Sequence, residues 1–95
     1  MKEYTAQMSN WAGRWRLYVV LLGGLVFQWP EHDFGPGPTV PTVEERSRAL
    51  TALGFVVTDG AEWEWIEYSE THEDDTSPVR LLATIQVCSR DGGQP

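Results

Sequence analysis

The sequence predicts an α+β domain, a small and mainly antiparallel sheet of four to five strands with one helix packed on one face. Two observations carry this prediction. Residues 43–53 have both a start signal and a stop signal for a helix, and residues 14–22 and 79–87 alternate as strands do. The expected order is strand-strand-helix-strand-strand-strand, and the sequence does not determine how the strands pair.

A chain of 95 residues is long enough for one domain with one modest core. Residues 1–12 lack a clear period and predict a loose N-terminal arm. The domain proper is expected over residues 13–88, and residues 89–95 are expected to form a flexible tail.

The first strand is predicted at residues 14–22, where Trp15, Leu17 and Val19 would share one face. Gly23-Gly24 is a hairpin signal, so residues 25–29 are expected to return as a short second strand. Residues 30–41 hold four prolines and two glycines, which predict a loop.

The helix is expected at residues 43–53. Thr42 is a favourable N-cap, and Glu45 three residues later completes a capping box. Gly54 stands at the C′ position, where a left-handed conformation commonly ends a helix. The predicted apolar stripe consists of four residues: Val43, Ala49, Leu50 and Leu53.

Three further strands are predicted after the helix, at residues 55–58, 62–68 and 79–87. Asp59-Gly60 predicts a tight turn between the first two. Residues 69–78 are acidic and are expected to form a loop.

The formal net charge of −7 disfavours direct binding to nucleic acid, which depends on lysine and arginine. It equally disfavours adsorption to anionic membranes. Cys88 is the only cysteine, so no internal disulfide can form and a reducing cytoplasm is expected. The apolar run at residues 17–27 is too short to span a membrane and lacks a signal-peptide cleavage site.

The segment EWEWIEY, residues 62–68, alternates tryptophan with glutamate. In a strand, Trp63 and Trp65 would lie on one face, and either pack under the helix or form an exposed aromatic platform for a partner. The candidate binding residues are the following: Trp63, Trp65, Tyr68, Trp29 and Phe34.

The acidic residues of the same region support a second hypothesis, a mimic of nucleic acid that occupies the basic groove of another protein. The candidate acidic surface consists of seven residues: Glu62, Glu64, Glu67, Glu70, Glu73, Asp74 and Asp75. Arg16 is expected to pair across strands with Glu62 or Glu64.

His32 and His72, each next to acids, are weak candidates for a metal-dependent enzyme or sensor. No HExxH, Cys pair, calcium-loop or nucleophile-elbow pattern occurs, so no metal, cofactor, small-molecule substrate or catalytic residue is expected.

Five segments resemble a family of small proteins of Streptomyces and related actinobacteria that is known only as a domain of unknown function. They are WRLYVVLL, WPEHDFG, PTVEERSRALTALGF, AEWEWIEY and SPVRLLATIQV. The resemblance implies a cytoplasmic bacterial protein and supplies no activity. The leading functional hypothesis is a non-enzymatic module that binds another protein, or itself, through an aromatic surface or a free sheet edge.

Overall fold

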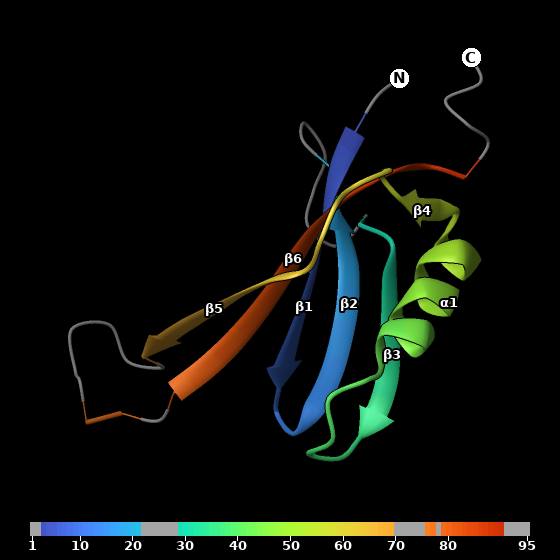
Figure 1. The fold of residues 1–95 in the computed structure, drawn as a ribbon. Coiled ribbons are helices and arrows are strands. Elements are labelled where there is room, and N and C mark those ends of the chain that lie inside the picture. Colours follow the sequence, from blue (N-terminus) through green and yellow to red (C-terminus); the bar gives the residue numbers. More distant parts are fainter. Residues whose placement is uncertain (1–2, 22–28, 70–75, 78, 91–95) are drawn as a thin grey trace.

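The structure is a computed structural model that describes residues 3–21, 29–69, 76–77 and 79–90. In this part of the chain, six antiparallel strands form one curled sheet and one helix packs against it, which confirms the predicted α+β class (Figure 1). The elements in chain order are β1 (Glu3–Trp11), β2 (Arg14–Val20), β3 (Glu31–Pro36), α1 (Val43–Leu53), β4 (Phe55–Val57), β5 (Glu64–Ser69) and β6 (Val79–Ser89).

The prediction of a loose N-terminal arm is wrong, because β1 lies inside the sheet between β2 and β6. Ala6 and Met8 are fully buried, and Tyr4 packs against the same core. Ala12 and Gly13 connect β1 to β2 with φ values of 54° and 78°. Two consecutive positive φ values are typical of a two-residue type I′ hairpin, whose twist matches that of the flanking strands.

The sheet has the order β3-β2-β1-β6-β4, and β5 also pairs with β6. The long strand β6 therefore has β1 along one edge and two short strands along the other. β4 pairs with its C-terminal end, from Val87 to Ser89, and β5 pairs with Val79 to Thr84. The predicted turn is present, since Ala61 N donates to Thr58 O at 2.9 Å. It connects two strands that pair with β6 rather than with each other.

The core lies between α1 and one face of the sheet. Alternation selects this face: the side chains that point to it come from every second residue of β1, β2 and β6. The buried cluster consists of Ala6, Met8, Trp15, Leu17, Val19, Leu50, Ala83, Ile85 and Val87. The predicted inward face of residues 14–22 is confirmed by Trp15, Leu17 and Val19.

The helix begins and ends where the sequence predicts. The Thr42 side chain accepts from Glu45 N at 3.1 Å, and Glu45 Oε1 accepts from Thr42 N at 2.8 Å. Gly54 closes the helix in the left-handed region with φ of 96°. The buried stripe differs from the prediction at two positions: Val43 is exposed, and Arg46 is buried. Arg46 has the correct spacing for the stripe, but a charged side chain is rarely buried.

Residues 31–36 form the edge strand β3 where the sequence predicted a loop. The prolines are compatible with this strand because Pro30 precedes it and Pro36 ends it, and an edge strand leaves one side without partners. A register shift opposite Arg14 and Arg16, together with Gly35 at φ of 90°, bends the strand.

The other boundaries shift by a few residues. Most of the predicted strand at 25–29 lies outside the described residues, and Trp29 itself is in a bend before β3. Ser69 belongs to β5 and Ser89 belongs to β6, so both strands extend into the predicted loop and tail.

Asp33 attaches β3 to β2, and we predict that it makes stability depend on acid pH. Its carboxylate accepts from Gly35 N at 2.7 Å and from Arg14 Nε at 2.9 Å, and these two bonds lower the pKa of Asp33 below its ordinary value. The ionised carboxylate therefore contributes its full stabilisation of the fold at pH values above the ordinary pKa of aspartate. This contribution is lost as the pH falls through the lowered pKa that Asp33 has in the folded protein.

Asp33→Asn should accordingly reduce the free energy of unfolding at neutral pH, and the difference from the native protein should shrink as the pH falls below about 4. Urea denaturation at a series of pH values measures this. Glu31→Gln on the same strand is the control. If the difference in unfolding free energy between Asp33→Asn and the native protein stayed constant across the acid range, the stabilising role of the ionised Asp33 would be contradicted.

Candidate functional site

β5 is a free edge strand whose side chains lie largely in solvent. It pairs with β6 on one side, and no described strand pairs with its other side. Residues from Glu64 to Tyr68 are all exposed. In an antiparallel strand, alternate backbone N–H and C=O groups point to each edge, so β5 offers a row of them to an additional strand.

Large apolar side chains are exposed along this strand. Trp65 is 43% exposed, Ile66 49% and Tyr68 44%, and Leu81 on the adjacent β6 is 40% exposed. Single exposed apolar residues are normal on protein surfaces, whereas several along one short strand and its neighbour indicate a candidate interaction site. We call Trp65, Ile66, Tyr68 and Leu81 the ribbon patch, after the two-stranded ribbon that β5 forms with the first half of β6 (Figure 1).

The ribbon patch has two faces. Trp65 is opposite Ala83, whose side chain is in the core, so Trp65 lies on the helix side of the sheet. Ile66 is opposite Leu82, and Tyr68 follows two residues later, so both lie on the open side. Both faces of the ribbon are therefore apolar at this edge.

Arg46 holds the base of β5 against α1. Its guanidinium carbon lies 5.0 Å from the ring centroid of Trp63 and 5.7 Å from that of Trp65, and its Nε donates to Pro41 O at 2.9 Å. Among the described residues no carboxylate forms a salt bridge with it, and burial lowers the pKa of Arg46. The two indoles supply the favourable contact for this cation.

Trp65 also reaches inward over the sheet. Its ring meets that of the buried Trp15 edge to face, with centroids 6.2 Å apart and an interplanar angle of 84°. The small side chain of Ala83, opposite Trp65, leaves room for this contact. One part of the Trp65 ring therefore completes the core, and the rest remains available to a partner.

The open side of the ribbon continues toward β1 through a cation–π contact. The Arg80 guanidinium carbon lies 4.5 Å from the ring centroid of Trp11, and Arg80 Nη1 donates to Asn10 O at 3.0 Å. Arg80 is directly opposite Tyr68 in the register. Trp11, 58% exposed, therefore enlarges the aromatic surface beside Tyr68.

Carboxylates border the same edge. Glu62, Glu64 and Glu67 are all exposed, and within the described ranges none of them forms an ion pair. The other members of the predicted acidic surface, Glu70 and residues 73–75, lie outside the described residues.

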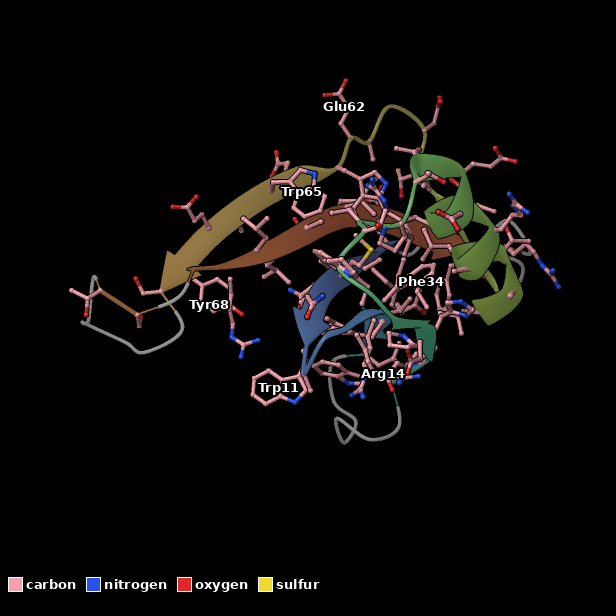
Figure 2. All side chains as sticks on the ribbon, turned by 90° about the horizontal axis from the view of Figure 1, so that it is seen from below. Trp11, Arg14, Phe34, Glu62, Trp65 and Tyr68 are labelled. Atoms are coloured by element: carbon pink, nitrogen blue, oxygen red, sulfur yellow. The ribbon has the colours of Figure 1, made fainter. Side chains whose placement is uncertain are left out.

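The predicted binding residues divide into two groups. Trp65 and Tyr68 lie exposed on β5, and Trp63 is half-buried against the core just before it. Phe34 is on β3, at the opposite edge of the sheet and beside α1 (Figure 2). Trp29 stacks on Tyr18 with ring centroids 5.9 Å apart. Trp29 and Phe34 thus do not share the surface formed by β5.

The histidine candidates are only partly described. His32 is half-buried, and its ring meets that of Phe34 edge to face with the ring centroids 4.6 Å apart. Both residues line a shallow cavity of about 250 Å³ between β3 and α1. His72 lies outside the described residues. In the ranges that the structure describes, no group of three His, Cys, Asp or Glu side chains is arranged to hold a metal ion.

The predicted pairing of Arg16 with Glu62 or Glu64 is wrong. Arg16 Nε lies 3.8 Å from Asp33 Oδ2 on the adjacent β3. The reason is topological, because β1 and β6 separate β2 from β5 in the sheet.

Sequence reasoning missed Arg46, Trp11, Ile66 and Leu81. The sequence did contain a signal for the burial of Arg46. It stands three residues before Ala49 and four before Leu50, so all three lie on the same side of the helix. No local signal existed for Ile66 and Leu81, because their exposure depends on the place of β5 at the edge of the sheet.

In the ranges described, no helix is long and apolar enough to span a membrane. A family model with the description "Family of unknown function (DUF6303)" matches residues 2–94. Neither the curated proteins nor the solved structures contain a significant match.

Proposed function

The chain belongs to this family of unknown function, DUF6303, and we propose that it is a non-enzymatic interaction module that receives an extended strand of a partner protein at the edge of β5. One observation carries the proposal: a six-residue free edge strand exposes three large apolar side chains at 43–49%. The sequence predicts an aromatic surface or a free sheet edge, and this is supported by β5, which combines exposed aromatic side chains with an edge to which no described strand pairs.

Strand addition explains why both features occur together. Backbone hydrogen bonds along the edge supply affinity that does not depend on sequence, and contacts with alternate side chains supply specificity. An incoming strand would place its side chains beside Trp65 on one face of the ribbon and beside Ile66 and Tyr68 on the other. Without a partner, such an edge is a site of aggregation.

The partner is expected to be a different protein rather than a second copy. Two antiparallel β5 strands in a register centred on Glu64 or on Glu67 would place that carboxylate directly opposite its own copy, and like charges directly opposite are destabilising. The net charge of −7 on each chain adds to the repulsion. As part of the same proposal, we place the module in the cytoplasm of an actinobacterium, in agreement with its single cysteine.

Photo-crosslinking in the native cells tests the proposal. A benzophenone amino acid at position 66 should give a discrete adduct with a protein of another sequence, identified by mass spectrometry. The same group at Ser47, exposed on the outer face of α1, should not give that adduct. Tyr68→Lys should remove the adduct while the unfolding transition stays in place.

Adducts that were identical from positions 66 and 47, or their absence from both, would overturn the proposal. An adduct with a second copy of the chain would show that β5 serves self-association instead.

The three exposed carboxylates favour a second candidate function, a mimic of nucleic acid that binds a basic groove. The two candidates respond differently to salt. Contacts made by exposed charges weaken strongly at high ionic strength, whereas a complex held by backbone hydrogen bonds and buried aromatic surface weakens little.

A further inference from the structure

Arg46 is a buried cation without a counter-ion. Its side chain is 7% exposed, and in the part of the chain that the structure describes it is the one charged side chain that is buried. Its Nε donates to Pro41 O, so the remaining four N–H groups, on Nη1 and Nη2, have no acceptor among the described residues. Neither Nη atom is completely enclosed, so this end of the guanidinium reaches the surface.

The place of Arg46 in α1 adds to the cost of its burial. Arg46 N donates to Thr42 O at 2.9 Å, so the residue belongs to the first turn of the helix. The N–H groups of a first turn create a positive potential, which stabilises anions and disfavours cations. A negative charge beside the guanidinium would therefore offset two costs, the removal of a cation from water and its position at this end of the helix.

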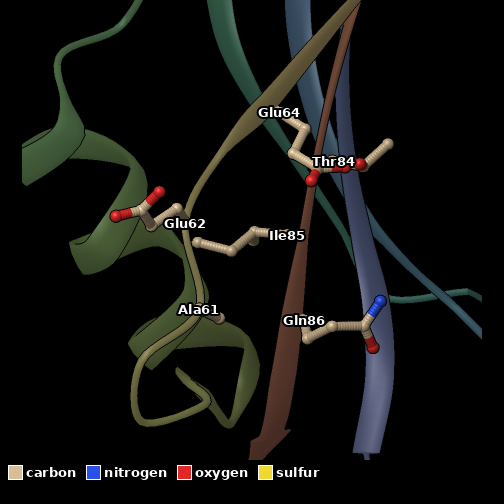
Figure 3. A pocket seen from close by; sticks show the side chains of 6 residues that line it. All are labelled: Ala61, Glu62, Glu64, Thr84, Ile85 and Gln86. Carbon is tan, nitrogen blue, oxygen red and sulfur yellow. The ribbon is translucent and has the colours of Figure 1, made fainter.

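The described acids nearest to Arg46 in sequence, and those beside Trp63, do not supply this charge. Glu44 and Glu45 are engaged within the helix, in an ion pair and in the capping box. Within the described ranges, neither Glu62 nor Glu64 forms an ion pair with Arg46. In Figure 3, Glu64 extends toward β6 and Glu62 points away from it.

We infer that Arg46 binds a carboxylate of the partner protein, the side chain of an aspartate or glutamate that reaches the base of β5. The inference rests on the proposed function, since it specifies the chemistry of the partner beside the same strand. The two oxygens of a carboxylate match two parallel N–H groups of a guanidinium, and charge-assisted hydrogen bonds of this kind are stronger than neutral ones.

The guanidinium is held in place before any carboxylate arrives. The hydrogen bond from Nε to Pro41 O fixes one edge, and the rings of Trp63 and Trp65 lie 5.0 Å and 5.7 Å from the guanidinium carbon. An exposed arginine must be ordered when it forms an ion pair, whereas Arg46 is already ordered by these contacts. Trp65 also joins this site to the ribbon patch, because its ring contacts Arg46 and is itself partly exposed.

Sodium propionate, which reproduces the end of a glutamate side chain, tests the chemistry of the site. Titration into the ¹⁵N-labelled chain should shift the Nε–H resonance of Arg46 and the indole N–H resonances of Trp63 and Trp65 until they saturate. Propionamide has the same shape without the charge. It should bind at least about tenfold more weakly, because hydrogen bonds between charged groups are the stronger ones.

Three results of this titration would overturn the inference. They are equal binding of propionate and propionamide, equal shifts with sodium chloride at the same ionic strength, and tighter binding of inorganic phosphate than of propionate. The comparison uses the native protein, so it gives a decision even if a variant of Arg46 does not fold.

Arg46→Lys tests the geometry, because lysine keeps the charge and lacks the two parallel N–H groups. It should weaken the binding of propionate about tenfold and should reduce the yield of the crosslink from position 66. Arg48→Lys makes the same change at an exposed arginine of the same helix and should alter neither.

The crosslink separates this inference from the proposed function. An unchanged yield in a folded Arg46→Lys variant would overturn the carboxylate of the partner and leave strand addition intact. Binding of propionate that depends on Arg46, without any crosslink from position 66, would keep the carboxylate site and overturn strand addition.

Discussion

Removal of residues 1–11 is expected to leave the chain unfolded. These residues contain β1, which pairs with β2 on one side and β6 on the other, so its loss would expose the facing edges of both strands. It would also remove Ala6 and Met8 from the centre of the core, where both are fully buried. Circular dichroism and urea denaturation should show no cooperative transition in the shortened chain.

A single substitution in the same strand tests this with less disruption. Met8→Ala should lower the free energy of unfolding by about 2–5 kcal/mol, through lost apolar contact and the cavity left behind. Total stabilities of small domains are about 5–15 kcal/mol, so this change alone brings the domain near its limit. Glu3→Ala, exposed at the start of β1, should stay within about 0.5 kcal/mol of the native protein. A cooperative transition in the shortened chain would show that β1 is dispensable.

Trp63→Ala is expected to destabilise the domain by about 2–4 kcal/mol, somewhat less than the full value for a buried tryptophan because the ring is half-buried. Trp63 packs against the core cluster, and its ring lies under the Arg46 guanidinium at 5.0 Å. Its removal would expose core atoms and leave a buried cation with one indole fewer.

Trp65→Ala should have a smaller effect on stability, because 43% of the side chain is already exposed, and a larger effect on partner binding. Urea denaturation of the two variants measures the first effect, and the crosslinking yield at position 66 measures the second. Equal destabilisation by the two substitutions would show that Trp65 belongs to the core and would remove it from the ribbon patch.

The two tryptophans of the segment EWEWIEY thus have different surroundings: Trp63 lies just before β5, half-buried against the core, and Trp65 lies exposed on β5. Trp63 is covered by α1 and Trp65 lies where that cover ends. Period-two alternation predicts the shared face, and it carries no information about how far the helix extends over it. The two hypotheses, a core residue and an exposed platform, thus fall on different residues: Trp63 is half-buried before β5, and Trp65 is exposed on it.

Arg46 is a buried residue that the sequence did not predict, although its spacing from Ala49 and Leu50 fits the apolar stripe of α1. Its position fits the buried stripe of α1, but an arginine is rarely buried without a carboxylate partner. Trp63 and Trp65, seventeen and nineteen residues later, make this burial possible through contacts that no local pattern records.

The sequence by itself determined the elements whose signals are local. Thr42, Glu45 and Gly54 specify where α1 begins and ends, because capping depends on residues within one turn of each end. Alternation specified β2 and β6 and their inward faces. These are interactions between near neighbours, and they need no knowledge of the rest of the chain.

Only the tertiary structure decided the place of β1 at the centre of the sheet, the extended conformation of the proline-containing β3, and the free edge of β5. Each depends on pairing between residues far apart in sequence: Thr5 with Gln86, for example, joins the two ends of the chain. The weak alternation of β1 becomes a strand because β2 and β6 satisfy its backbone on both sides. β1 takes one edge of β6, β4 and β5 share the other, and no described strand pairs with the second side of β5.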